Sequence, residues 1–184
     1  MRRMMTWAVA LSVLGGCASQ PLPVETAQAM PSAYGLAAGD KVRLTTFGFE
    51  EFSGEFMVAA DHSLAIPMLG AVPVRGVTPD QLERNLERSL TDKGLIRNPR
   101  VSVEVTKYRP YYIAGEVQRP GKYDFASGLT VMQAVADAGS FTYRAKKTMV
   151  FIKREGALQE VAVPVTAAAP VMPGDTIRVV ERYF

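Results

Sequence analysis

The stretch YYIAGEVQRPGKYDFASGLTVMQAVADAG, Tyr111 to Gly139, contains the pattern that decides the fold of the second half of this chain. Its aromatic and aliphatic residues predict strands at Tyr111–Ala114 and Lys122–Phe125. Gly115 and the pair Pro120-Gly121 between them are typical of an enlarged hairpin turn. We therefore expect an antiparallel hairpin at the start of this stretch.

A helix is predicted directly after the hairpin. Thr130-Val131-Met132-Gln133 has the Thr-x-x-Gln spacing of a capping box, and Ala134, Val135 and Ala138 continue an apolar face as far as Gly139. Further strands are expected at 148–154, 158–164 and 175–180. Two strands, a helix and then further strands is the order of a β-grasp domain, which we place at residues 108–184 in the α+β class.

The preceding block, residues 34–107, is expected to be β-rich with one amphipathic helix. Thr78-Pro79-Asp80-Gln81 again forms a capping box, with proline at the first helical position. Leu82, Leu86 and Leu90 lie on one face, which places the charged residues between them outside, and Gly94 is a helix terminator. Strands are predicted at 41–47, 55–58, 63–67 and 70–74, and from Val101, where valines alternate with polar residues.

The N-terminus has the pattern of a secretory signal. Arg2 and Arg3 precede the apolar run Thr6–Leu14, which is too short to span a bilayer because a helix needs about 20 residues. Gly15, Gly16 and Cys17 follow. We predict a signal peptide at residues 1–16 and a proline-containing tether at 17–33. The alternatives to this signal are a frayed N-terminal helix or a wrongly assigned start of the chain, and the alternative to a lipidated cysteine is an ordinary signal peptide with an incidental cysteine.

The composition does not favour disorder, nucleic-acid binding or catalysis. The chain is 48% hydrophobic and 21% charged, with a net charge of +3 and no long charge run. His62 is the only histidine and Cys17 the only cysteine, too few for a zinc site or a Cys-His pair. Glu50, Glu51 and Glu55 are better explained as a solvated loop than as a glycosidase pair. We predict no catalytic residue, no metal and no cofactor.

Two surfaces remain as candidate contacts with a polymer or a neighbouring subunit. The first is the cluster Tyr108, Arg109, Tyr111 and Tyr112 at the boundary between the blocks, for which a rigid hinge is the simpler interpretation. The second is the basic stretch 140–154, which contains Arg144, Lys146 and Lys147 and no acidic residue; a solvated face explains it equally well.

Two turns also resemble each other. LAAGDKVRLT (36–45) and VMPGDTIRVV (171–180) each place Gly-Asp before a strand. Glycine permits the turn and aspartate can accept hydrogen bonds from nearby backbone N–H groups. The same similarity can arise in two unrelated turns that each begin a strand, so we infer no duplicated domain from it.

Five segments carry a resemblance to a known family. YGLAAGDKVRLTTFGFEEFSGEFMV, IPMLGAVPVRGVTPDQLERNLERSL and NPRVSVEV resemble the polysaccharide export domain of bacterial outer-membrane polysaccharide export lipoproteins. YYIAGEVQRPGKYDFASGLTVMQAVADAGSFTYRAKK resembles the soluble ligand-binding β-grasp domain that follows it in that family. Leu14-Gly15-Gly16-Cys17 resembles the lipobox, in which the cysteine is acylated, and Ala18-Ser19 without aspartate favours sorting to the outer membrane.

The resemblance implies a non-enzymatic role in exporting capsular polysaccharide or exopolysaccharide. It implies a homo-oligomeric ring, lipid-anchored at Cys17 to the periplasmic face of the Gram-negative outer membrane. Its partners would be the polysaccharide and an inner-membrane co-polymerase, in some members coupled to a tyrosine kinase. Because IRVVERYF is not followed by a pore-lining helix, we expect a short-type member that requires a separate outer-membrane β-barrel. The alternative is a monomeric periplasmic lipoprotein that binds a soluble glycan or another ligand.

The family often has glycine where this chain has His62. Histidine should be tolerated there if the backbone avoids positive φ.

Overall fold

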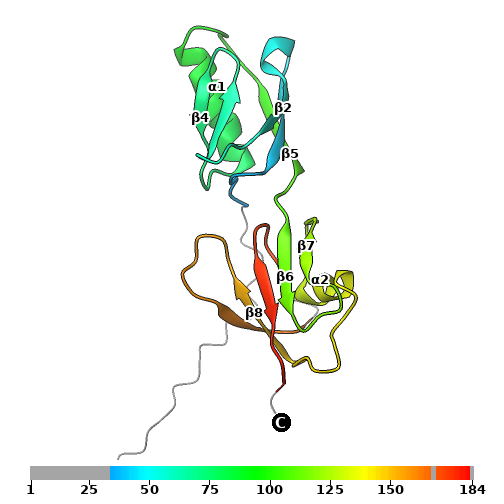
Figure 1. Ribbon diagram of the computed structural model, residues 1–184. Helices are drawn as coiled ribbons and strands as arrows, with labels where there is room; N and C mark the ends of the chain where they lie inside the picture. Colours follow the sequence, from blue (N-terminus) through cyan, green and yellow to red (C-terminus); the bar gives the residue numbers. More distant parts are fainter. Residues whose placement is uncertain (1–33, 167–168, 183–184) are drawn as a thin grey trace, which may run out of the picture.

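A computed structural model describes residues 34–166 and 169–182. The predicted signal peptide (1–16), Cys17 and the tether (17–33) lie outside the described residues. The described chain is α+β, as predicted, with two groups of strands that each enclose their own hydrophobic core. Figure 1 shows the two groups one above the other, joined by the segment between β5 and β6.

The first domain contains a three-stranded antiparallel sheet of order β2-β1-β5 and a separate hairpin, β3-β4. Its elements are β1 (Lys41–Thr46), the 3-10 helix η1 (Glu50–Phe52), β2 (Gly54–Met57), β3 (Ser63–Ile66), β4 (Gly70–Pro73), α1 (Pro79–Asp92) and β5 (Val101–Lys107). Leu82, Leu86 and Leu90 of α1 are buried in the core that the sheet and hairpin share. Burying each leucine contributes about 1.5–3 kcal/mol.

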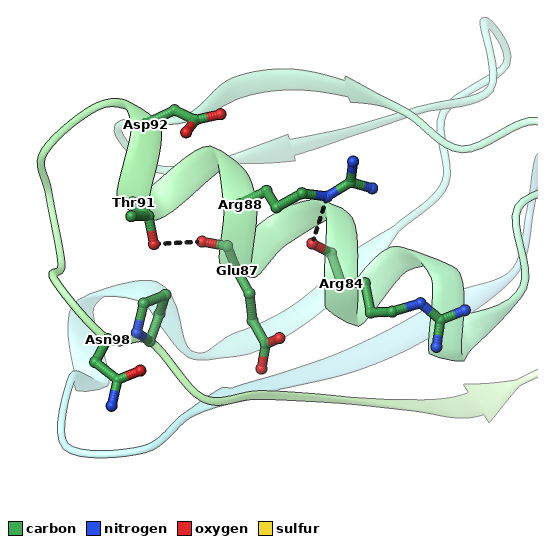
Figure 2. A pocket seen from close by; sticks show the side chains of 7 residues that line it. Arg84, Glu87, Arg88, Thr91, Asp92 and Asn98 are labelled. Atoms are coloured by element: carbon green, nitrogen blue, oxygen red, sulfur yellow. Dashed lines mark hydrogen bonds between the residues drawn. The ribbon is translucent and has the colours of Figure 1, made fainter.

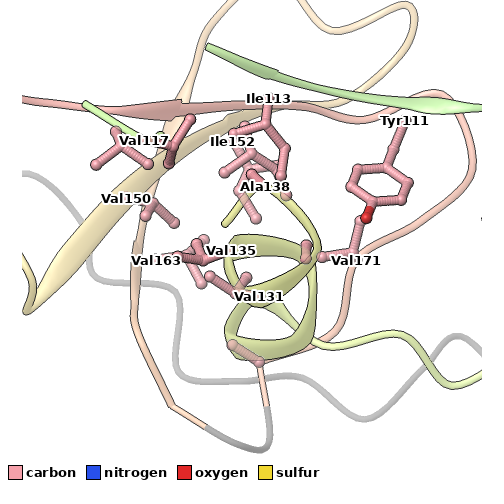
Figure 3. Close-up of a cluster of buried hydrophobic side chains, with 14 of the residues drawn as sticks. Tyr111, Ile113, Val117, Val131, Val135, Ala138, Val150, Ile152, Val163 and Val171 are labelled. Carbon is pink, nitrogen blue, oxygen red and sulfur yellow. The ribbon is translucent and has the colours of Figure 1, made fainter. Parts of the chain in front are cut away.

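The second domain is a mixed five-stranded sheet of order β7-β6-β10-β8-β9 with one helix packed against it. Its elements are β6 (Tyr111–Gly115), β7 (Gly121–Tyr123), α2 (Val131–Asp137), β8 (Met149–Lys153), β9 (Val161–Pro164) and β10 (Thr176–Val179). The last strand, β10, lies in the middle of the sheet, parallel to β6 and antiparallel to β8. Figure 3 shows Val131 and Val135 of α2, and Ala138 directly after it, on the side of the helix that faces Ile113 and Ile152 of the sheet.

Both predicted capping boxes are confirmed. The backbone N–H of Gln81 donates to Thr78 Oγ1 at 3.2 Å, and the N–H of Thr78 donates to Gln81 Oε1 at 3.1 Å. Thr130 and Gln133 make the equivalent pair at the start of α2. These bonds satisfy backbone donors that a helix start otherwise leaves unpaired, which is why the two helices begin where the sequence predicts.

Several details differ from the expectations. The strand predicted at 122–125 ends at Tyr123, and the strand predicted from Leu158 begins at Val161 because a turn at Gly156 precedes it. His62 has a φ of 61°, so the condition under which histidine was expected to be tolerated at this position is not met. Histidine is among the residues that adopt this left-handed conformation more readily, and the backbone there is fixed by a bond from Val74 N–H to His62 O at 2.8 Å.

Candidate functional site

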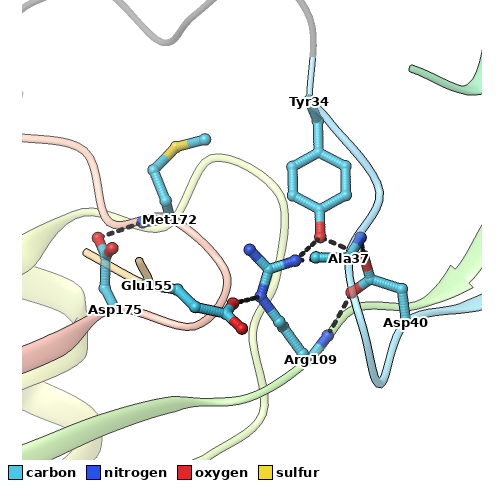
Figure 4. A network of polar contacts seen from close by, with 7 residues as sticks. All are labelled: Tyr34, Ala37, Asp40, Arg109, Glu155, Met172 and Asp175. Carbon is cyan, nitrogen blue, oxygen red and sulfur yellow. Dashed lines mark hydrogen bonds and ion pairs between the residues drawn. The ribbon is translucent and has the colours of Figure 1, made fainter. Parts of the chain in front are cut away.

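The two Gly-Asp turns that echo each other in sequence have the same local structure, and both lie at the junction of the domains. Gly39 and Gly174 have φ values of 92° and 83°, so glycine suits both positions. Asp40 accepts a bond from the N–H of Ala37 at 2.9 Å, and Asp175 accepts one from the N–H of Met172 at 2.8 Å. Figure 4 shows the two turns on opposite sides of Arg109.

Arg109 connects the two domains through the buried carboxylate of Asp40. Its backbone N–H donates to Asp40 Oδ1 at 2.9 Å, and its guanidinium Nη1 lies 3.3 Å from Asp40 Oδ2. Nη1 also donates to the Tyr34 hydroxyl at 2.7 Å, and that hydroxyl donates to Asp40 Oδ2 at 2.5 Å. On the other side, Arg109 Nε forms an ion pair with Glu155 at 2.5 Å. The positive charge of Arg109 is therefore matched by acids from both domains.

The two aspartates differ in their surroundings. The carboxylate of Asp40 is fully paired, whereas Asp175 Oδ1 is buried without a hydrogen-bond partner. Burial raises the pKa of Asp175 to about 6, although the nearby Arg154 and Arg109 act in the opposite direction. Burial, together with the Asp40 carboxylate, also raises the pKa of the Tyr34 hydroxyl, which stays protonated and can act as a donor.

The structure separates the three tyrosines of the predicted surface cluster. Tyr111 is fully buried in the second core, and its hydroxyl donates to Asp137 at 2.9 Å, so it is a core residue and does not form a surface contact. Burial raises the pKa of this hydroxyl too. Tyr108 lies edge-on between Tyr34 and Phe125, with ring centroids 5.1 and 5.4 Å away. Tyr112 points outward and is 44% exposed.

An open pocket of about 550 Å³ lies at this junction. Residues from both domains line it: Ala38, Gly39, Lys41, Lys107, Tyr108, Arg109, Pro110, Tyr112, Lys122, Glu155 and Gly174. Three of these are lysines that the sequence did not single out, because they are far apart along the chain. The pocket thus combines positive charge with an exposed aromatic ring.

The second predicted surface lies at the opposite end of the second domain. Strand β10 (Thr176–Val179) begins directly after Asp175 at the junction, and the carbonyl of Val180, just past its other end, accepts a bond from the N–H of Lys146 at 2.9 Å. Arg144 is paired with Glu181 at 2.5 Å, whereas the side chains of Lys146 and Lys147 are exposed. The structure therefore does not bring the basic stretch together with the Tyr108–Tyr112 cluster.

A groove of about 450 Å³ along α1 is a weaker candidate. Figure 2 shows that several of its polar groups bond within the helix itself: Thr91 Oγ1 donates to the carbonyl of Glu87 at 2.9 Å, and Arg88 Nε donates to that of Arg84 at 3.3 Å. The Glu87 carboxylate accepts a bond from the backbone N–H of Val101 in β5 at 3.1 Å. These groups are engaged in holding the first domain together.

The part of the chain that the structure describes contains no group of three or more His, Cys, Asp or Glu side chains arranged to hold a metal ion. Within the same residues, no helix is long and apolar enough to cross a membrane.

The fold thus defines a two-domain α+β protein in which a β-rich domain precedes a β-grasp domain. Residues 28–106 match the family model of polysaccharide biosynthesis/export proteins, and residues 110–163 match that of the SLBB domain. The chain therefore combines a polysaccharide biosynthesis/export domain with an SLBB domain, in agreement with the resemblance seen in the sequence.

A curated relative supports this assignment. The chain is 39% identical over 88 residues to the exopolysaccharide production protein ExoF of Rhizobium meliloti (strain 1021). The matched segment is 47% of this chain and 21% of that relative, so the chain spans only a small part of its length.

Proposed function

We propose that this protein is a component of a bacterial export channel for capsular polysaccharide or exopolysaccharide. The match of both domains, in order, to the polysaccharide biosynthesis/export and SLBB families carries the proposal. The likeness to a protein of exopolysaccharide production supports it. In this role the protein binds and guides polymer in the periplasm between an inner-membrane co-polymerase and an outer-membrane exit. We predict that it performs no catalysis.

Anchoring at Cys17 is part of this proposal. The lipobox-like Leu14-Gly15-Gly16-Cys17 and the following Ala18-Ser19 favour acylation and retention at the periplasmic face of the outer membrane. Stable anchoring requires more than one acyl chain, which a fully acylated cysteine provides. Cys17→Ser should abolish labelling by a radioactive fatty acid and shift the protein out of the outer-membrane fraction, whereas Ser19→Ala should do neither. Unchanged labelling of Cys17→Ser would contradict the anchor.

Ring formation separates this proposal from its alternative, a monomeric glycan-binding lipoprotein. A ring of identical subunits repeats one heterologous interface until it closes. Crosslinking the full chain in intact envelopes should give a ladder of oligomers that ends at one closed size. A monomer that persists at every crosslinker concentration would support the monomeric alternative and count against the channel.

A further inference from the structure

Three lysines from both domains converge on the junction pocket. Lys41 begins β1 and Lys107 ends β5, and the two face each other directly in the sheet register. Lys122 is in β7 of the second domain, opposite Tyr112 in the register with β6. All three line the same 550 Å³ space, although they belong to three strands of two different sheets.

The charges of these lysines are largely unmatched inside the protein. Lys107 has one partner, Asp124, at 3.6 Å, in a pair whose side chains are 58% and 80% exposed. No carboxylate of the described residues lies within ion-pair distance of Lys41 or Lys122. Glu155, the acid in the lining, is paired with Arg109. The pocket therefore carries a net positive charge, because Lys41 and Lys122 have no ion-pair partner among the described residues and the one partner of Lys107 is exposed.

Such an arrangement works against folding. Like charges directly opposite each other in a sheet are destabilising, and Lys41 and Lys107 occupy such a pair. Positions that break a local rule without an internal compensation are expected at functional sites. A bound anion would supply the missing compensation here, because it would neutralise both ammonium groups at once.

The rest of the lining fits a sugar. Tyr112 presents an exposed ring beside Lys122, and Tyr108 is held in place by its contacts with Tyr34 and Phe125. The face of an aromatic ring carries partial negative charge and attracts the weakly positive C–H groups of a sugar ring, while the tyrosine hydroxyl can hydrogen-bond. The volume lies within the usual range for small-molecule pockets, about 300–1,000 Å³.

We propose that this pocket binds a carboxylate-bearing sugar unit of the polymer, with Lys41, Lys107 and Lys122 pairing with the carboxylate and Tyr112 stacking on the sugar ring. The inference rests on the proposed export function and names the chemistry of its substrate. Lysine ammonium groups act as flexible point charges, so they suit a carboxylate that is presented in more than one orientation along a chain.

The test is isothermal titration of the full chain in detergent with an oligogalacturonate tetramer. The same titration is run with maltotetraose, a neutral tetramer, and with tetraglutamate, which carries carboxylates but no sugar. The wild type should bind the oligogalacturonate more tightly than either of the other two, and binding should weaken as salt rises, because exposed charges are screened. Equal binding of maltotetraose would overturn the role of the carboxylate, and equal binding of tetraglutamate would overturn that of the sugar.

Matched charge variants locate the site. Lys41→Gln/Lys122→Gln should weaken oligogalacturonate binding about tenfold, since each lost ion pair is worth up to about fivefold. Lys146→Gln/Lys147→Gln removes the same charge at the opposite end of the domain and should leave affinity unchanged. An equal loss of affinity in both double variants, or no binding of oligogalacturonate by the wild type, would overturn the proposal that this pocket binds the sugar unit. Either result would leave the export function untouched, because export is tested separately by the location of polymer in a deletion strain. Failure of the pocket proposal is therefore distinguishable from failure of the proposed function.

Discussion

The guanidinium of Arg109 lies 3.3 Å from the carboxylate of Asp40, and this contact joins the segment that enters the second domain to the turn that precedes the first strand of the first domain. The Asp40 side chain is completely buried and that of Arg109 is 15% exposed. A buried ion pair of this kind contributes little by itself, but removing one partner leaves an uncompensated charge. Arg109 should therefore be sensitive to substitution.

Arg109→Ala should lower the free energy of unfolding by about 3 kcal/mol or more. The control is Arg43→Ala, which breaks the exposed Arg43–Glu55 pair, at 2.8 Å, and should cost less than about 1 kcal/mol. Urea denaturation followed by circular dichroism measures both. Asp40→Asn/Arg109→Ala should be more stable than Arg109→Ala, because no charge remains buried. If both arginine variants lose equal stability, the buried pair does not hold the junction.

Asp175 should make stability depend on pH. Its pKa rises from 3.8 to about 6 on folding, so the folded state favours the protonated form. The resulting stabilisation is fully present below about pH 4 and is lost as pH rises through 6, by up to about 3 kcal/mol. Asp175→Asn removes this contribution. The free energy of unfolding of the wild type minus that of Asp175→Asn should fall between pH 4 and pH 7; a constant difference would contradict the raised pKa.

Glu83 of α1 pairs with a backbone N–H group at the edge of the first sheet. Its carboxylate accepts a hydrogen bond from the N–H of Val103 in the edge strand β5 at 2.8 Å. Glu83→Ala should destabilise by about 1 kcal/mol and speed hydrogen exchange at the Val103 amide. Glu83→Gln keeps an acceptor oxygen and should retain most of the protection. Equal exchange rates in the two variants would mean that the bond does not protect the edge.

Gly115 leaves no room for a side chain. It has a φ of 89°, and a Cβ there would lie 2.0 Å from the carbonyl oxygen of Val179 in the neighbouring strand. Gly115→Ala should destabilise by about 3 kcal/mol or more, because strain and a backbone clash add. Gly121→Ala is the matched control, since a Cβ at that position would meet no atom of the described residues within 4 Å and its φ is not positive. Thermal unfolding of the two variants compares them directly, and similar midpoints would refute the close approach.

Local signals in the sequence predicted the elements well. The two capping boxes and the Leu82, Leu86 and Leu90 spacing act within a single turn or face, so both helices were placed closely. The alternation of side chains along a strand also indicates which tyrosines are buried, and the prediction of a surface cluster did not use it. In a strand that begins at Tyr111, Ile113 shares its face and Tyr112 lies on the other, so alternation alone indicates that Tyr111 is buried and Tyr112 exposed.

Long-range relationships could not be predicted from the sequence. Glu83 and Glu87 were placed on the solvent side of the helix, because nothing local indicates that β5 offers its free N–H groups to them. The ion-pair partners of Arg109 are Asp40 and Glu155, which lie far from it in the sequence. The three pocket lysines lie on three different strands. Only the packing of the two domains brings these residues together. The similarity between the turns at Gly39-Asp40 and Gly174-Asp175 was the one feature of the sequence that indicated a shared local structure at the starts of β1 and β10.

The most direct test of the export function is the location of polymer in cells that lack this protein. A clean deletion is compared with the wild type and with a strain complemented by the wild-type chain, and polymer is quantified at the cell surface and in the periplasm. The proposed function predicts that surface polymer is lost, that periplasmic polymer accumulates, and that complementation reverses both. An unchanged amount and location of polymer in the deletion strain would contradict it.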